Sequence, residues 1–170
     1  CNGTEDGRFI RWAEGDVSAL VNPHKRQWYN DAKAKGTLFF TEAYEDISNH
    51  QMVVSAAAPY KGADGAIRGA VCVDISLATL DTRVKNLKYH GEGQGIIVEP
   101  SGLIIASSEG MAMHKVDENP VLKENFPAML QNKEGYFATE KDGEEQIIAY
   151  TTVPSSGWIV AIAVPESVAF

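Results

Sequence analysis

The sequence has few cysteines, few basic residues and no long apolar run, and each shortage excludes a class of protein. Its 170 residues include two cysteines, and because one of them is the first residue, we do not expect a stabilising disulfide. Basic residues number 15 against 23 acidic ones, and the net charge of −8 argues against nucleic acid as a partner. No apolar run approaches the ~18 residues of a membrane-spanning helix. The 44% of hydrophobic residues is ordinary for a globular protein.

Catalytic and cofactor-binding motifs are also missing. The four histidines are scattered and do not have the spacing of metal ligands. The sequence contains neither a phosphate-binding loop nor a nucleophile elbow, and the glycines of residues 91–95 are too close together for a dinucleotide fingerprint. Cys72 lies within an apolar strand and is expected to be a buried thiol. We therefore expect no enzymatic activity, no cofactor and no bound metal.

Alternating apolar and polar residues predict short strands over most of the chain. Two stretches are expected to be helical: residues 22–35, which end before a glycine, and residues 77–89, which follow the capping hydroxyl of Ser76. Residues 108–131 are expected to be a loop with some helix, cut by Pro120 and Pro127.

A weak internal repeat organises the chain. The turn and strand at residues 6–10 resemble those at residues 101–105, and the strand at 65–73 resembles the one at 157–164. The repeat predicts an α+β protein made of two tandem modules, each an antiparallel sheet with flanking helices.

Polar and aromatic residues in the first half form a candidate site for a zwitterion. On the predicted helix, Arg26 and Tyr29 are three residues apart and share one face, and an arginine can hold a carboxylate with two hydrogen bonds. Asp74 ends a strand whose neighbours on the same face are small, which leaves room for a ligand. Opposite charges with aromatic walls between them complement a free amino acid. A structural ion pair of Asp74 remains the alternative. The candidate ligand-binding residues are Arg26, Trp28, Tyr29, Tyr44, Asp46 and Asp74.

The same residues stand in a pattern that resembles a known family. Residues 26–32 (Arg-x-Trp-Tyr-x-x-Ala), residues 40–46 (Phe-Thr-Glu-Ala-Tyr-x-Asp) and residues 65–75, which end in Val-Asp-Ile, are similar to the membrane-distal module of a double Cache, PAS-like sensor domain. Residues 96–106 and 157–164 resemble its membrane-proximal module. The resemblance covers nearly the whole chain.

The resemblance implies an extracytoplasmic, periplasmic sensor domain of a bacterial transmembrane receptor, with a chemotaxis receptor as the expected output. It divides the chain into a distal ligand-binding module (1–77), a connecting helix and hinge (78–95) and a proximal module (96–170). The flanking transmembrane helices would lie outside this chain, and the full-length receptor would be a homodimer. Members of the family begin with a long helix that links the modules, so we expect the present chain to be a truncated piece.

The amino-acid-binding subfamily implies a role for each candidate residue. By that resemblance, Arg26 and Trp28 hold the carboxylate of the ligand, Tyr29 and Asp74 hold its ammonium, and Tyr44 and Asp46 complete the site. The family motif has a tyrosine five residues before the arginine, where this chain has Val21. The prediction is therefore a small ligand with an amine, an amino acid first of all.

Two other readings stay open. The chain could serve a histidine kinase or a diguanylate cyclase that recognises another small molecule, or it could dock a periplasmic binding protein, in which case the Arg26 region would be structural. The second module has aromatic residues (Tyr136, Tyr150 and Trp158) but no clear pair of arginine and aspartate, so it is expected to be a structural spacer.

Overall fold

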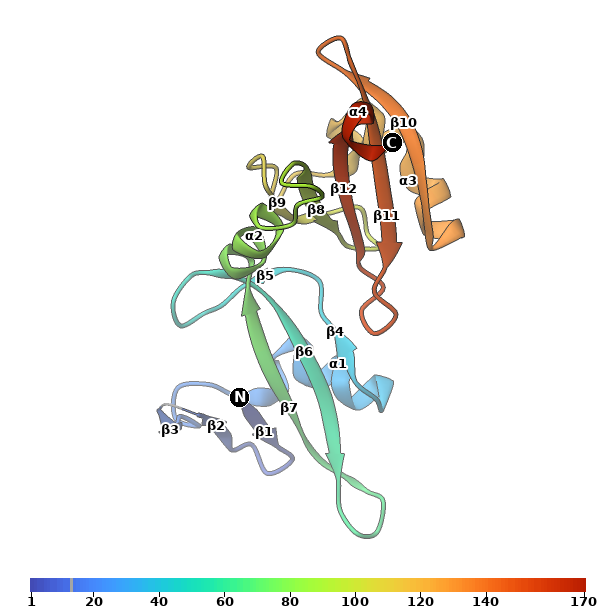
Figure 1. Cartoon of the computed structure of the whole chain (residues 1–170). Coiled ribbons are helices and arrows are strands. Elements are labelled where there is room, and N and C mark those ends of the chain that lie inside the picture. Colours follow the sequence, from blue (N-terminus) through green and yellow to red (C-terminus); the bar gives the residue numbers. More distant parts are fainter. Residues whose placement is uncertain (13) are drawn as a thin grey trace. The chain divides into compact units, whose positions relative to one another are not determined.

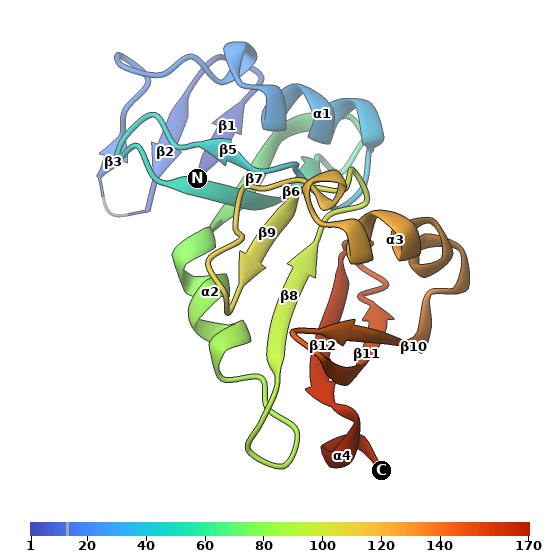
Figure 2. The same cartoon turned by 90° about the horizontal axis from the view of Figure 1, so that it is seen from above.

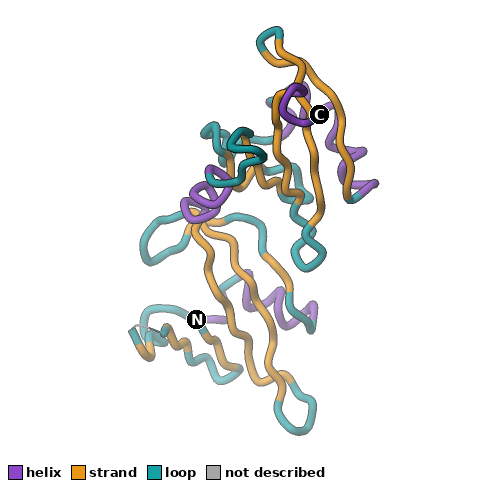
Figure 3. Tube along the Cα trace, viewed as in Figure 1, coloured by secondary structure: helices purple, strands orange, loops and turns teal. Residues whose placement is uncertain are grey.

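Strands make up most of the regular structure, as the alternating sequence pattern predicts (Figure 3). The computed structural model describes residues 1–12 and 14–170. These residues divide into two compact units, Cys1–Ile75 and Ser76–Phe170, and each unit contains its own antiparallel sheet (Figure 1). The predicted α+β class with two antiparallel sheets is therefore confirmed.

The sheet of the first unit is built around the long hairpin of β6 and β7. The described strands run in the order β3-β2-β1-β7-β6-β4, and β5 also pairs with β6. Helix α1 packs against β6 (Figure 1). The bounds are β1 Asn2–Thr4, β2 Phe9–Arg11, β3 Gly15–Asp16, η1 Pro23–Lys25, α1 Gln27–Lys35, β4 Phe39–Phe40, β5 Tyr44–Glu45, β6 Met52–Lys61 and β7 Ile67–Ser76.

The predicted helix over residues 22–35 is broken at Arg26. Asn22 caps a 3-10 turn by accepting a hydrogen bond from the backbone N–H of His24 at 2.9 Å. Arg26 then has extended backbone angles (φ −96°, ψ 126°), and α1 begins at the next residue. The helix ends where expected, at Gly36, whose φ of 71° lies in the left-handed region that glycine tolerates best. The break at Arg26 decides which side chains of this segment reach the candidate site.

The two cysteines form a disulfide, so the prediction of unpaired cysteines and of a buried Cys72 thiol is wrong. Strand β1 pairs antiparallel with β7, and Asn2 lies opposite Val71. This register places Cys1 beside Cys72, and their Cα atoms are 5.2 Å apart. The position of Cys1 in the sequence could not show this, because the pairing depends on a strand register that closes a loop of 71 residues.

The second unit has a simpler sheet, in the order β10-β11-β12-β8-β9. Helix α2 begins at the capping hydroxyl of Ser76, as predicted, but it ends at Lys85 and lies along β8 and β9 (Figure 2). The bounds are α2 Leu77–Lys85, β8 Gln94–Val98, β9 Ile104–Ser107, η2 Val116–Glu118, α3 Pro120–Asn132, β10 Glu134–Lys141, β11 Glu144–Thr152, β12 Ile159–Pro165 and α4 Glu166–Ala169.

Helix α3 replaces the second part of the loop predicted for residues 108–131. Asn119 caps it, and Pro120 is its first residue, where a missing N–H removes no helical hydrogen bond. Pro127 lies inside the helix, and the helix continues past it to Asn132. Met129 packs into the core of the unit with Ile148. Within the described residues, no helix is long and apolar enough to cross a membrane.

Candidate ligand-binding site

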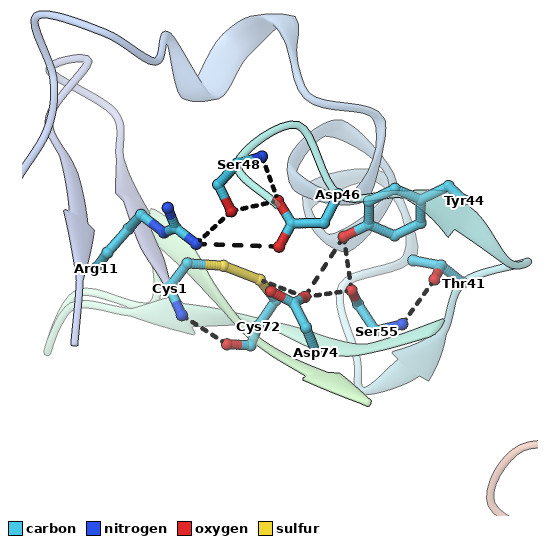
Figure 4. Close-up of a disulfide and its surroundings, with 9 residues drawn as sticks. All are labelled: Cys1, Arg11, Thr41, Tyr44, Asp46, Ser48, Ser55, Cys72 and Asp74. Atoms are coloured by element: carbon cyan, nitrogen blue, oxygen red, sulfur yellow. Dashed lines mark hydrogen bonds and ion pairs between the residues drawn. A yellow bond between two sulfur atoms is a disulfide. The ribbon is translucent and has the colours of Figure 1, made fainter. Parts of the chain in front are cut away.

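A cavity of about 330 Å³ lies in the first unit, near the C-terminal end of strand β7. It brings together five of the six predicted residues: Arg26, Trp28, Tyr44, Asp46 and Asp74. The rest of its lining comes from Cys1, Phe9, Arg11, Glu14, Val17, Leu20, Val21, Ile47 and Ser48. Residues from both ends of the unit's sequence thus meet at one cavity (Figure 4).

Asp74 is held at the edge of the cavity by two hydroxyl groups. The Ser55 hydroxyl donates to Asp74 Oδ1 at 2.5 Å, and the Tyr44 hydroxyl lies 2.7 Å from Ser55 Oγ and 3.4 Å from the same carboxylate oxygen (Figure 4). The backbone N–H of Ser55 donates to the Thr41 hydroxyl at 2.9 Å, which fixes the serine in turn. Both hydroxyls point to one oxygen of Asp74, so the other oxygen keeps its capacity to accept from a ligand.

Tyr44 stays a neutral hydroxyl in this arrangement. Burial raises its pKa, the hydrogen bond with Ser55 lowers it, and the negative charge of Asp74 raises it again, with a net increase. Tyr44 can therefore donate or accept a hydrogen bond over the whole physiological pH range.

A second acidic group, Asp46, is fixed by its own loop and by an arginine from β2. Ser48 donates to Asp46 Oδ1 from its backbone N–H and its hydroxyl, both at 2.9 Å. Arg11 Nη2 lies 3.9 Å from Asp46 Oδ2 and donates to the Ser48 hydroxyl at 2.8 Å (Figure 4). Burial alone would raise the pKa of Asp46, but these bonds and the nearby positive charges lower it on balance. Asp46 is therefore ionised at neutral pH.

Arg26 and Trp28 line the cavity from the segment where α1 begins. The extended backbone at Arg26 lets both side chains reach the cavity, and Trp28 is buried at 4% exposure. Arg26 is half-buried, and its guanidinium forms no ion pair within residues 1–12 and 14–170. The charge of Arg26 helps to lower the pKa of Asp46, but its guanidinium holds no carboxylate in direct contact and is open to an anionic ligand.

Tyr29 lies away from the cavity, unlike the other predicted residues. It is fully buried, and its hydroxyl donates to Glu5 Oε1 at 2.8 Å. Lys33 Nζ lies 2.7 Å from the same carboxylate oxygen. The sequence argument assumed that Arg26 and Tyr29 share a helical face, but Arg26 precedes the helix. Tyr29 therefore packs inside the unit, and Arg26 shares the cavity with Trp28.

Four polar residues of this site were not among the predicted ones: Arg11, Glu14, Ser48 and Ser55. The run of small residues in which Ser55 lies was a signal, because a small side chain beside Asp74 leaves a hydroxyl within reach. Arg11 carried no comparable signal. Val21, which stands where the family motif has a tyrosine, does line the cavity, as the alignment of that motif predicts.

The site offers no metal centre of the usual kind. Cys1, Cys72 and Asp74 have potential ligand atoms within 4.8 Å of one another. The two sulfurs are joined in a disulfide and are not the thiolates that bind metals. A larger hollow of about 660 Å³ adjoins the cavity and shares Arg26, Trp28, Tyr44 and Ile47 with it, but it does not reach Asp74.

The first unit thus combines an antiparallel sheet with a cavity that carries charges of both signs. The Cache domain family (dCache_1) matches residues 4–170. The chain therefore belongs to the Cache domain family.

Curated relatives are chemotaxis proteins. The chain is 30% identical over 158 residues to the methyl-accepting chemotaxis protein TlpA of Bacillus subtilis, which covers 92% of this chain and 22% of TlpA. It is 28% identical over 171 residues to PctB of Pseudomonas aeruginosa, which covers 99% of this chain and 26% of PctB. The chain thus spans about a quarter of the length of the curated relatives it matches.

Solved ligand-binding domains, one of them from a chemoreceptor, share the fold. The domain of Pseudomonas fluorescens CtaA in complex with L-serine matches with a TM-score of 0.74 and 25% identity, over 98% of this chain and 71% of that one. The ligand-binding domain of Mlp24 with asparagine matches with a TM-score of 0.64 and 29% identity, over 99% of this chain and 68% of that one.

Proposed function

We propose that this chain is the extracytoplasmic ligand-binding domain of a transmembrane chemotaxis receptor, and that its first unit binds a small ligand with an amine, most simply an amino acid. One observation carries the proposal: Arg26, which makes no contact ion pair within the described residues, and the solvent-open Asp74 line one cavity. The relatives, which are chemotaxis proteins, and the related domains bound to serine and asparagine support it.

Asp74 and Arg26 bind opposite ends of the ligand. The free oxygen of Asp74 accepts from the ammonium, and the guanidinium of Arg26 holds the carboxylate in the bidentate manner that arginine favours. Trp28 and Tyr44 form the walls, and Tyr44 adds a neutral hydroxyl beside the ammonium. The apolar residues Val17 and Ile47 face the ligand side chain.

The cavity has the right size for this task. Its volume of about 330 Å³ lies at the small end of the roughly 300–1,000 Å³ of small-molecule sites. In the receptor, the first unit would be distal to the membrane and the second proximal, with transmembrane helices outside this chain and a homodimeric assembly. Ligand binding would act by shifting the population between two arrangements of the domain.

A ligand series that removes one charge at a time tests the proposal. L-alanine, 2-aminopropane and propionate share a three-carbon skeleton. L-alanine carries both charges, 2-aminopropane carries the ammonium alone, and propionate carries the carboxylate alone. We expect calorimetry to show binding of L-alanine or another L-amino acid, and weaker binding of the analogues. A hydrogen bond to a charged group contributes about 1.5–3 kcal/mol. Loss of one such contact should therefore weaken binding by roughly 10- to 150-fold.

Two variants with matched controls assign the charges to residues. Asp74→Asn should weaken L-alanine strongly and propionate little, whereas Arg26→Gln should weaken L-alanine and leave 2-aminopropane nearly unchanged. The controls are Asp64→Asn and Arg68→Gln, an exposed ion pair of 2.6 Å at the turn after β6. If a folded domain binds no L-amino acid and no amine in a thermal-shift screen, the proposed function is wrong, and docking of a binding protein becomes the better explanation.

A further inference from the structure

A separate cavity of about 260 Å³ lies entirely within the second unit. Its lining comes from β8, β10, β11 and β12, from the start of α3, and from the segment that follows β9. The lining residues used below are Gln94, Ile96, Glu109, Thr139, Lys141, Gln146, Ile148, Ala161 and Ala163. Sequence analysis expected this unit to be a spacer, so the cavity needs its own explanation.

The floor of the cavity is apolar because one face of the sheet presents alternate residues. The register pairs Ile96 with Ala161 and Ile148 with Ala163, so these four side chains lie on the same face of neighbouring strands. Helix α3 covers the adjoining part of this face, where Met129 packs into the core. The two alanines leave the uncovered part hollow, and Ile96 and Ile148 provide its apolar surface.

The Lys141 and Glu109 charges at the rim satisfy each other. Glu140 also belongs to the lining, but it alternates with Thr139 and Lys141 along β10, so its side chain lies on the other face of the strand. Lys141 Nζ lies 2.5 Å from Glu109 Oε1 and donates to Gln94 Oε1 at 3.0 Å. A charged ligand would have to break this pair, because a carboxylate would compete with Glu109 and an ammonium with Lys141. The rim therefore disfavours a ligand of either sign.

Two uncharged polar groups remain for a ligand. Thr139 and Gln146 lie directly opposite each other on β10 and β11, and both are half-buried. Within the described part of the chain, neither side chain forms a hydrogen bond. A hydroxyl and a carboxamide both donate and accept, so together they match a hydroxyl or amide on a ligand.

We propose that this cavity is a second ligand site, for a small uncharged molecule with an apolar body and one hydroxyl or amide end. The body packs on Ile96, Ile148 and the two alanines, and the polar end reaches Thr139 and Gln146. The site differs from the one in the first unit in position and in chemistry, and the proposal does not depend on amino-acid binding there.

Three isosteric probes test the charge preference. Benzyl alcohol, benzoate and benzylamine have the same ring and differ in the charge of one end group. We expect benzyl alcohol to bind with a dissociation constant in the low millimolar range or tighter, as ligand efficiency allows for about eight heavy atoms, and the charged probes to bind at least tenfold more weakly. In two-dimensional NMR titrations, the shifted amides should lie on β10, β11 and β12 around the cavity.

Variants place the binding in the cavity. Ala163→Leu fills the hollow and should abolish the benzyl alcohol shifts, and Gln146→Leu should weaken binding without closing the space. Ala149→Leu, on the exposed face of the same sheet, is the matched control and should change nothing. Asp74→Asn should leave benzyl alcohol binding intact, which separates this site from the first. Equal binding of the three probes, shifts outside the cavity, or unchanged binding in a folded Ala163→Leu protein would overturn the proposal.

Discussion

Reduction of the disulfide is expected to destabilise the first unit far more than the second. The Cys1–Cys72 bond closes a loop of 71 residues between β1 and β7. For a loop of this size, the loss of chain entropy in the unfolded state corresponds to roughly 4 kcal/mol at 25 °C. A unit of about 75 residues has a total stability of about 4–11 kcal/mol. Reduction should therefore remove a large part of that stability and lower the unfolding midpoint by at least about 15 °C.

Tryptophan fluorescence can follow the first unit alone. In a Trp158→Phe protein, the remaining tryptophans are Trp12, which is fully exposed, and Trp28, which is buried. The change in emission on heating then reports mainly on Trp28 and the first unit. We expect a large downward shift of this transition in dithiothreitol, and no further effect of dithiothreitol on a variant with both cysteines changed to serine. A protein whose thiols titrate as reduced but whose midpoint moves by only a few degrees would refute the reasoning.

Three further changes have expected outcomes. Gly3→Ala should destabilise the first unit by about 1–3 kcal/mol in urea unfolding, because its Cβ would lie 2.6 Å from Pro23 Cβ and 2.8 Å from the Tyr29 ring; an unchanged midpoint would contradict this packing. Hydrogen bonds from Lys33 and Tyr29 lower the pKa of Glu5 from 4.5, so its contribution to stability is present above that pH and lost as pH falls through the lowered value; Glu5→Gln should flatten this acid limb of the unfolding midpoint against pH. Val21→Tyr, which adds a hydroxyl to the wall of the first cavity, should tighten amino-acid binding in calorimetry, and weaker binding would show that valine is there to make room.

The parts of the fold that follow from local sequence could be predicted well. Ser76 caps α2 and Gly36 ends α1 because these signals depend on one turn of backbone. The hairpin of β6 and β7 follows from two apolar runs of strand length around a glycine-containing turn. The disulfide could not be predicted in this way, since it requires β1 to pair with a strand about seventy residues further along.

The candidate site was predictable in composition but not in geometry. The residue types around Arg26 and Asp74 indicated a site for opposite charges, and both line the cavity. Tyr29 lies outside the cavity because of a single backbone conformation: an extended Arg26 breaks the predicted helix, so that α1 begins only at Gln27, and this changes which side chains share a face. Arg11 reaches the site from β2 through the tertiary fold, which no local pattern encodes.

An inner strand of each sheet borders a cavity, and the bordering residue differs in chemistry between the two units. Strand β7 lies between β1 and β6, and β12 lies between β8 and β11, so each is an inner strand of its sheet. The alternate residues Ala70 and Cys72 on β7 are buried, as are Ile159 and Ala161 on β12. Two residues further along each strand, on the same face, a residue lines a cavity. This residue is Asp74 in the first unit and Ala163 in the second. A carboxylate at the edge of a cavity favours a cationic group on a ligand. A methyl group favours an apolar one, because an unpaired charge next to apolar groups costs free energy. Asp74 thus agrees with the ammonium site proposed for the first cavity, and Ala163 agrees with the uncharged ligand proposed for the second.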